Sequence, residues 1–241
     1  MTQQLFISDL HLSAERLDTV RLFLRFLSDR APEADHLYIL GDLFDAWVGD
    51  DDVASPIPEV KQAMRQLSQT GTRLWLMHGN RDFLIGEGFC RETGAELLQD
   101  PTLVVLYGKS TLLMHGDLLC TDDQAYMKFR REVRDPGNIK RLLSQSIQQR
   151  MELAKTYRAK SGEAKSLKPE SIMDVNRETV ASYLVEYQAE HLIHGHTHRP
   201  ADHVIDLKNR RHYRHVLAEW HHDHGELVCV TPDGFRREAY S

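Results

Sequence analysis

Several short apolar runs in this sequence end in residues whose side chains can bind metal ions. Carboxylate, amide and imidazole groups follow these runs, close to glycines, and no thiolate stands among them. Such a set suits Mn²⁺, Fe or Zn²⁺ better than Mg²⁺. Two ions about 3.5–4 Å apart clamp a phosphoryl group and activate a hydroxide between them, so no Ser or Cys nucleophile is needed. We therefore expect a two-metal phosphoester hydrolase with ligands at Asp9, His11, Asp42, Asn80, His115, His196 and His198.

Each of these short patterns is weak evidence by itself. An Asp-x-His pair is more often a turn or a cap than a metal site, and Gly-Asn is usually a turn. Their order after successive apolar runs is what favours a site. Asp9 and His11 at the end of one strand can both reach one ion, and the two oxygens of Asp42 can bridge two ions.

The apolar runs have the length of buried strands, bounded by turn residues. Helical spacing of apolar residues around 20–27 and 60–67 separates the first runs, so strand and helix alternate and an α/β core is predicted. In α/β sheets, ligands bind beyond the carboxyl ends of the strands, so these ends can converge on one crevice. The expected strands are residues 5–7, 37–40, 74–77, 111–114 and 192–193.

The C-terminal residues 203–240 alternate β-rich runs with turns, and we expect a meander there in a second sheet. The histidine-rich run at 221–224 is interpreted as a solvated turn. Trp47, Trp75 and Trp220 are expected to pack in the core or the wall of the site, not to form a nucleobase platform.

Composition excludes several classes of protein. The chain has 241 residues and a net charge of -6, which disfavours nucleic-acid binding and therefore a nuclease. Its three cysteines are isolated, so neither a disulfide framework nor a thiolate zinc site is expected. We find no signal peptide and no apolar stretch of about 18 residues, so secretion and membrane insertion are not expected.

One segment departs from this acidic balance. Residues 128–168 carry 12 Lys and Arg residues against 4 Asp and Glu residues. Apolar spacing predicts two helical pieces separated by a turn at 135–138. Two interpretations stay open: surface helices with solvated charges, or a basic insertion at about 122–170 that covers an anionic substrate within a single domain of residues 1–241.

The ordered motifs Asp-x-His, Gly-Asp, Gly-Asn-Arg-Asp, His-Gly-Asp and Gly-His-Thr-His resemble those of the calcineurin-like metallophosphoesterases. The resemblance covers most of the chain. It implies an α/β fold, a double-sheet α-β-β-α sandwich with a helical lid insertion. It also implies one metal on Asp9, His11, Asp42 and His198, and a second on Asp42, Asn80, His115 and His196.

Arg81 stands where most members of that superfamily have histidine, which is held to protonate or steady the leaving group. Arginine cannot act as a general acid near neutral pH, but it stabilises negative charge. A phosphate monoester leaving group needs no proton, because its second pKa is about 6. Arg81 therefore favours cleavage of a phosphoanhydride over a simple ester.

Longer stretches, at residues 39–51, 78–86, 114–123, 172–176 and 192–200, resemble one family of Mn²⁺-dependent hydrolases in the lipid A pathway of Gram-negative bacteria. This resemblance implies two Mn²⁺ per chain and hydrolysis of UDP-2,3-diacylglucosamine by a metal-bridging hydroxide. Attack at the α-phosphorus would give UMP and 2,3-diacylglucosamine 1-phosphate (lipid X). It also implies peripheral association with the cytoplasmic face of the inner membrane; we further expect a monomer.

By the same resemblance, Asn80, Arg81 and His196 are the catalytic residues. The residues expected to touch substrate are Asn80, Arg81, Asp123, Ser161, Lys165, Lys168 and His196. Cationic groups over a pyrophosphate are chemically sensible.

A second departure lies in the basic segment. Residues 135–158 are more polar than in the family, with a narrow apolar stripe, so weak membrane affinity is expected. A related enzyme acting on a soluble nucleotide anhydride or phosphodiester is therefore the alternative function. A metal-free interaction module on the same fold is disfavoured, because all the expected ligands are present.

Overall fold

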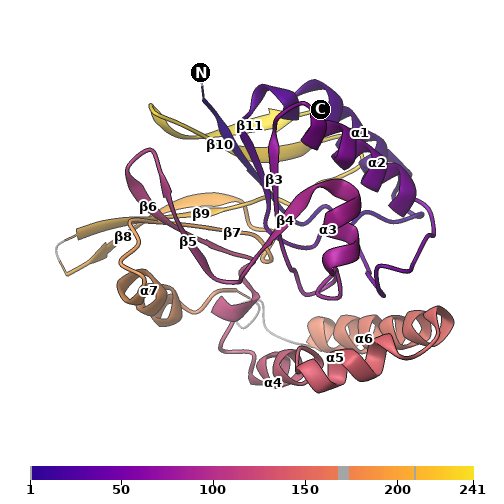
Figure 1. The fold of residues 1–241 in the computed structure, drawn as a ribbon. Coiled ribbons are helices and arrows are strands. Elements are labelled where there is room, and N and C mark those ends of the chain that lie inside the picture. Colours follow the sequence, from indigo (N-terminus) through magenta and orange to yellow (C-terminus); the bar gives the residue numbers. More distant parts are fainter. Residues whose placement is uncertain (1, 168–173, 209) are drawn as a thin grey trace.

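The computed structural model describes residues 2–167, 174–208 and 210–241, with side chains described outside 160–167. It contains two sheets (Figure 1). The first has the order β11-β10-β1-β2-β3-β4 and the second the order β5-β6-β7-β9-β8. The strands are β1 (Gln4–Ile7), β2 (His36–Ile39), β3 (Arg73–Met77), β4 (Ala95–Leu98), β5 (Thr102–Leu106), β6 (Lys109–Met114), β7 (His191–His194), β8 (Ala201–Leu207), β9 (Arg210–Val216), β10 (Gly225–Thr231) and β11 (Gly234–Tyr240).

Helices cover the outer faces of both sheets, and a further group lies beside the carboxyl ends of the strands (Figure 1). Helices α1 to α3 cover the first sheet, α7 covers the second, and α4 to α6 form the lateral group. The helices are α1 (Leu17–Asp29), α2 (Ile57–Gln69), α3 (Glu87–Thr93), α4 (Gln124–Val133), α5 (Pro136–Leu143), α6 (Ile147–Leu167) and α7 (Arg177–Glu186), with short 3₁₀ turns η1 (Ala31–Glu33) and η2 (Asp117–Leu119).

Alternating side chains build a layered core. In β1, Leu5 and Ile7 pack against α1 and α2, whereas Phe6 packs between the two sheets. In β7, Leu192 packs towards α7 and Ile193 packs between the sheets. Because successive strand residues point to opposite faces, both faces of each central strand are buried. The expected α-β-β-α sandwich is confirmed.

The C-terminal meander is not confined to one sheet, as the sequence had suggested. β8 and β9 lie in the second sheet, but β10 and β11 extend the first, where β10 pairs antiparallel with β1. The prediction of a single second-sheet meander was therefore wrong. The predicted alternation of β-rich runs with turns is confirmed at residues 232–233, where a turn joins β10 to β11.

The basic segment forms three helices, where two pieces were predicted. The expected turn at 135–138 is instead the start of α5, because the Asp135 side chain accepts hydrogen bonds from the amides of Gly137 and Asn138. A second break at Ser144–Ser146 separates α5 from α6. In the described parts of the chain, none of the helices has the length and hydropathy needed to cross a membrane.

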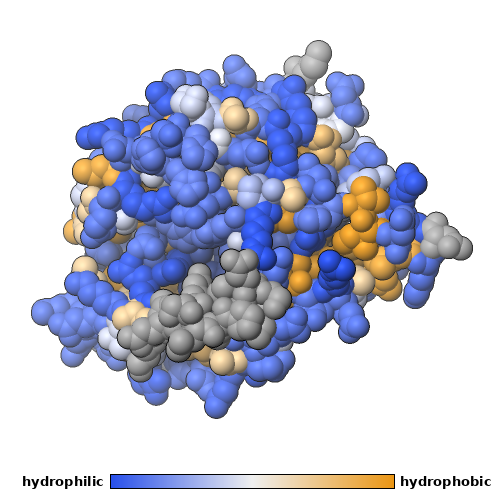
Figure 2. Space-filling model, turned by 180° about the vertical axis from the view of Figure 1, so that it is seen from behind, coloured by the Kyte–Doolittle hydropathy of each residue, from blue (hydrophilic) through white to orange (hydrophobic). Residues whose placement is uncertain are grey.

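The surface seen from behind is mostly hydrophilic, and its apolar residues gather in a few patches (Figure 2). The run at 221–224 is exposed and lies in a turn, as expected. Trp47 and Trp220 are buried among core residues.

Candidate active site

The expected metal ligands follow the carboxyl ends of strands from both sheets. Residues after β1, β2 and β3 meet residues after β6 and β7 where the two sheets come together. The loops are tied to each other by their backbones: the Asp9 amide donates to the Gly41 carbonyl at 3.1 Å, and the His11 amide donates to the Asp42 carbonyl at 3.0 Å. The convergence of five strand ends is confirmed, with the sheets contributing three and two.

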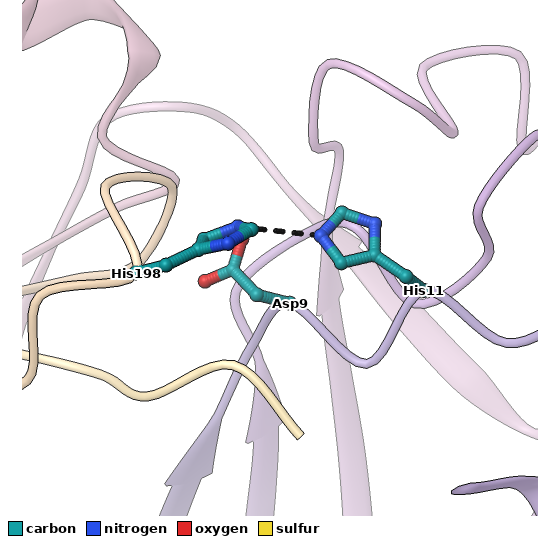
Figure 3. Close-up of side chains that lie close together, drawn as sticks. All are labelled: Asp9, His11 and His198. Carbon is teal, nitrogen blue, oxygen red and sulfur yellow. Dashed lines mark hydrogen bonds and ion pairs between the residues drawn. The ribbon is translucent and has the colours of Figure 1, made fainter. Parts of the chain in front are cut away.

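One group of ligand atoms belongs to Asp9, His11 and His198, which lie within 4.8 Å of one another (Figure 3). The Nε2 atoms of His11 and His198 are 3.3 Å apart, and His198 Nε2 lies 3.4 Å from Asp9 Oδ1. Asp9 Oδ1 is buried and has no hydrogen-bond partner among the described residues. A buried oxygen left in this way fits a cation.

A second group consists of Asp9, Asp42 and His115, again within 4.8 Å. Asp42 faces both groups, since its Oδ2 lies 3.9 Å from His11 Nε2 and its Oδ1 lies 3.8 Å from His115 Nε2. These residues therefore fit two divalent ions with Asp42 between them.

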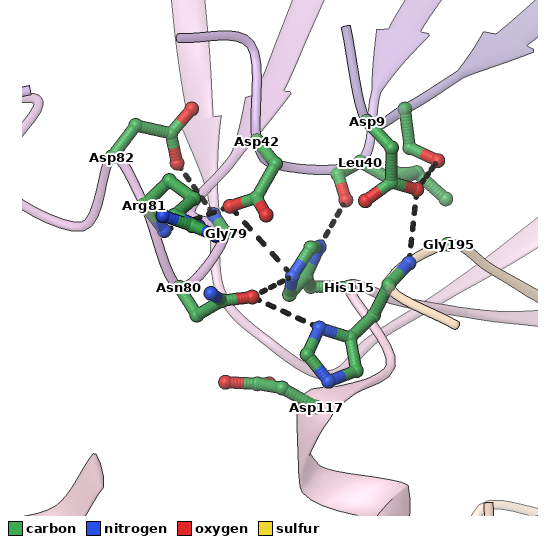
Figure 4. Close-up of polar contacts among 12 residues, drawn as sticks. Asp9, Leu40, Asp42, Gly79, Asn80, Arg81, Asp82, His115, Asp117 and Gly195 are labelled. Carbon is green, nitrogen blue, oxygen red and sulfur yellow. Dashed lines mark hydrogen bonds and ion pairs between the residues drawn. The ribbon is translucent and has the colours of Figure 1, made fainter. Parts of the chain in front are cut away.

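Asn80 adjoins the second group (Figure 4), and His196 lies next to Asn80. Asn80 Oδ1 lies 3.0 Å from His115 Nε2 and 2.9 Å from His196 Nδ1. His115 Nδ1 lies 2.9 Å from the Leu40 carbonyl, and only its N–H can donate there. This contact leaves His115 Nε2 with a lone pair that faces the site.

Burial and neighbouring charges shift the pKa values of the carboxylates in the site. Burial raises the pKa of Asp42 to about 7; His115 opposes this rise, while the carboxylates of Asp82 and Asp9 add to it. Burial also disfavours ionised Asp9, but the contact with His198 and the nearby histidine charges outweigh it and hold the Asp9 pKa well below its usual range. Buried carboxylates that lie close together repel one another when ionised. A bound cation would relieve that repulsion, so the site is suited to bind cations.

Two glycines allow the loops to approach this closely. A Cβ on Gly79 would collide with the carboxylate and the amide of Asp42, and a Cβ on Gly195 would collide with the side chains of Ser8 and Asp9. Both glycines belong to motifs read from the sequence, and both have a steric reason to be there.

A cavity of about 850 Å³ opens between the ligands and helices α4 to α6. Asn80, Arg81 and His196 line it from the sheets, and Phe129 and Tyr157 line it from the helices. The wall combines apolar and cationic side chains, so it can take an anionic ligand with an apolar part.

Some of the expected substrate residues line the cavity, and others lie outside the described residues. Arg81 lies in the cavity wall, with Nη1 3.9 Å from Asp45 Oδ1. Asp123 also lies there and caps α4, because its side chain accepts a hydrogen bond from the Tyr126 amide. The side chains of Ser161 and Lys165, and the whole of Lys168, lie outside the described residues.

Helix α4 is tied to the site through a buried carboxylate that the sequence showed only as part of a motif. Asp117 Oδ2 accepts hydrogen bonds from Tyr126 Oη and Arg130 Nε, both at 2.7 Å. Arg134 Nη2 donates to the Gly79 carbonyl at 2.8 Å. These contacts hold α4 next to the expected metal ligands.

Two further carboxylates support the site. Asp82 accepts hydrogen bonds from the amides of Gly79 and Leu43, both at 2.7 Å, and so joins two of the loops. Glu219 lies 2.8 Å from His198 Nδ1. The Gly-Asn-Arg-Asp motif contained Asp82, but no sequence pattern pointed to Glu219.

Comparison with known proteins places this site in a family. Residues 3–200 match the model of the calcineurin-like phosphoesterases. A UDP-2,3-diacylglucosamine hydrolase of Pseudomonas aeruginosa (strain UCBPP-PA14) is 49% identical over 98% of both chains. Hydrolases of the same name are 45% identical in Serratia proteamaculans, over 95% of both chains, and 50% identical in Marinobacter nauticus, over 90% of this chain and 88% of that one.

A solved structure of an archaeal phosphodiesterase aligns with 99% of both chains, at 10% identity and a TM-score of 0.49. The family assignment rests on the sequence matches, which span almost the whole chain. The chain belongs to the calcineurin-like phosphoesterases and, within them, to the family of the UDP-2,3-diacylglucosamine hydrolases.

Proposed function

We propose that this protein hydrolyses the pyrophosphate bond of UDP-2,3-diacylglucosamine in lipid A biosynthesis, releasing UMP and 2,3-diacylglucosamine 1-phosphate. The observation that carries the proposal is the pair of Asp and His groups next to a cavity with apolar and cationic walls, which His198 also lines. The names of relatives that are 45–50% identical over nearly the whole chain support the substrate.

We propose two Mn²⁺ ions as the cofactor. Asp9, His11, Asp42 and His198 would hold one, and Asp42, Asn80, His115 and His196 the other. When bound, such ions supply a hydroxide nucleophile near neutral pH and neutralise charge on the phosphoryl group. The mixed oxygen and nitrogen donors support Mn²⁺ over Mg²⁺.

The chain's own residues would orient and stabilise the substrate. Asn80 and His196, two of the proposed metal ligands, would also contact the phosphoryl group that is attacked. Arg81 carries a permanent charge at the cavity wall and would stabilise the departing phosphate, which needs no proton. Asp123, Ser161, Lys165 and Lys168 remain proposed substrate contacts.

Helices α4 to α6, within the proposed insertion at about 122–170, would serve as a lid over the diphosphate and the acyl chains. Arginines of the lid that line the cavity, such as Arg141 and Arg158, supply positive charge. We propose a monomer that associates weakly with the cytoplasmic face of the inner membrane. Exposed Leu143 and Met151 beside lid cations support that weak contact.

The test is hydrolysis of UDP-2,3-diacylglucosamine by the purified, metal-free protein with and without added Mn²⁺. We expect Mn²⁺-dependent UMP release, and in H₂¹⁸O the label should appear in UMP, since attack is at the α-phosphorus. Label in the sugar phosphate would contradict the point of attack. Turnover of soluble nucleotide anhydrides without turnover of the lipid would favour the alternative function.

A further inference from the structure

His198 is held from both sides of its ring. Its Nε2 points towards Asp9 and His11, and its Nδ1 lies 2.8 Å from Glu219 Oε2, within hydrogen-bond distance (Figure 3 shows the first side). The backbone of His198 has a φ of 55°, in the left-handed region that few residues other than glycine adopt. The backbone dihedral does not set the direction of the ring, which depends on the side-chain torsions, so side-chain contacts have to orient it.

Glu219 is itself fixed in place. Arg16, just before α1, donates from Nη1 to Glu219 Oε1 at 3.2 Å and from Nη2 to the Trp220 carbonyl at 2.6 Å. The Trp220 amide donates to the carbonyl of Asp9 at 3.2 Å. The segment that carries Glu219 is thus held next to Asp9. Because Arg16 contacts Oε1 of Glu219, Oε2 is left for His198.

We propose that Glu219 is a positioning residue for the metal centre that contains His198. By accepting the Nδ1 hydrogen, its carboxylate selects the tautomer in which the Nε2 lone pair faces Asp9 and His11. Metal-bound histidines commonly donate their other ring N–H to a carboxylate, and removing such a partner lowers metal affinity about 10- to 100-fold. The inference rests on the proposed two-metal function and adds a residue and a role to it.

The test is direct Mn²⁺ binding to metal-free protein, followed by the EPR signal of free Mn²⁺ and without substrate. We expect two equivalents in the wild type. In Glu219→Ala one equivalent should bind about 10- to 100-fold more weakly while the other is unchanged. Glu219→Gln keeps an acceptor for Nδ1–H but loses the charge. Its loss of Mn²⁺ affinity should therefore be clearly smaller than that of Glu219→Ala.

Glu190→Ala is the matched control. Glu190 also lies beside a histidine, 3.3 Å from His191 Nε2, but belongs to none of the groups at the metal site. The Glu190→Ala variant should bind both equivalents of Mn²⁺ with the affinity of the wild type. Metal-free Glu219→Ala loses its contacts with Arg16 and His198, so a small fall in melting temperature is expected, but its circular dichroism spectrum should match that of the metal-free wild type.

Three results would overturn the inference. Unchanged affinity at both sites in Glu219→Ala would show that His198 needs no such partner. Equal losses of affinity at both sites, together with an altered circular dichroism spectrum, would show a structural role. A wild type that binds no Mn²⁺ would instead contradict the proposed two-metal function, so the two failures are distinguishable.

Discussion

At the scale of single residues, the site is built on strained backbone. Five of the expected ligands have positive φ angles between 48° and 69°. A non-glycine residue in this region costs about 1–3 kcal/mol, and such residues persist where the surrounding structure holds them for a function. The strain is concentrated where loops must turn ligands inwards, at Asp9, His11, Asp42, His196 and His198.

Asp42 is the residue that the proposed assignment shares between the two metal ions, since its two oxygens face His11 and His115. We predict that Asp42→Ala lowers kcat/KM for the lipid substrate by more than about 1,000-fold, because it removes the carboxylate shared between two ions. UMP release and bound Mn²⁺ should be measured together. Asp223→Ala, on an exposed turn, is the control and should retain both. Substantial turnover in Asp42→Ala would refute the metal assignment.

Arg81 tests the nature of the leaving group. We predict that Arg81→His lowers kcat/KM by about 10- to 100-fold, since a charge-assisted contact contributes about 1.5–3 kcal/mol. Bound metal should stay unchanged, because the Arg81 side chain is not a ligand. Arg91→His, at an exposed position of α3, serves as the control. Equal rates for Arg81→His and the wild type would show that the guanidinium does not act on the leaving phosphate.

The sequence led to the seven expected ligands, because each lies in a short motif at a strand end. It did not lead to Glu219, since that residue follows β9 without a motif and meets His198 only through folding. Asp82 stood in a motif, but its role of joining two loops depends on the amide of Leu43, which is distant in sequence. Supporting residues of this kind are visible only in three dimensions.

At the scale of elements, the buried strands and long helices were predictable and sheet membership was not. β4 was missed because its residues are partly exposed and lack a long apolar run, whereas β5 was missed although residues 103–106 form an apolar run as long as those of the predicted strands. β10 has the same apolar character as the strands of the second sheet, but pairs with β1. Pairing between distant strands depends on long-range geometry, which local periodicity does not encode.

Helices α4 to α6, the proposed lid, depend on a few polar contacts with the rest of the molecule. Arg150 of α6 is buried, with the Val48 carbonyl and the Asp51 carboxylate as partners of its guanidinium. Neither α4 nor α5 contains a buried residue. Segments with few buried apolar contacts open at low free-energy cost, so Arg150 is expected to hold α6 near the site.

We predict that Arg150→Met speeds amide hydrogen exchange in α6 and raises KM for the lipid substrate by about three- to tenfold, with kcat changed by less than about twofold. Methionine keeps much of the buried volume but loses the hydrogen bonds. Lys155→Met, at an exposed position of the same helix, is the matched control. Wild-type exchange and KM in Arg150→Met would show that the lid is held elsewhere.

At the scale of the whole molecule, the two sheets meet at a pair of histidines. His191 of β7 and His215 of β9 hydrogen-bond through Nδ1 and Nε2 at 3.1 Å. Phe235 of β11, in the other sheet, stacks on both rings with centroid distances of 4.1 and 4.6 Å. One of the two facing nitrogens must lack a proton, so this contact between the sheets requires neutral histidine.

Burial, the charge of His215 and that of Lys109 lower the pKa of His191 to about 4, although Glu190 opposes them. The unfolded state takes up a proton near pH 6.5, whereas the folded state does so only near pH 4. The stability that depends on neutral His191 is therefore complete above pH 6.5 and is lost as the pH falls towards 4. The shift corresponds to about 3 kcal/mol, which solvent screening reduces to about 2.

Accordingly, the free energy of unfolding should fall more steeply between pH 6.5 and 4 in the wild type than in His191→Phe, by about 2 kcal/mol. Urea unfolding of both metal-free proteins across this range measures the difference. Phenylalanine keeps the stack on Phe235 but cannot be protonated, so the variant separates charge from packing. His222→Phe, on the exposed turn, should follow the wild type. Parallel curves for wild type and His191→Phe would mean that the acid sensitivity arises elsewhere, because the variant has lost the titrating group and kept the contact between the sheets.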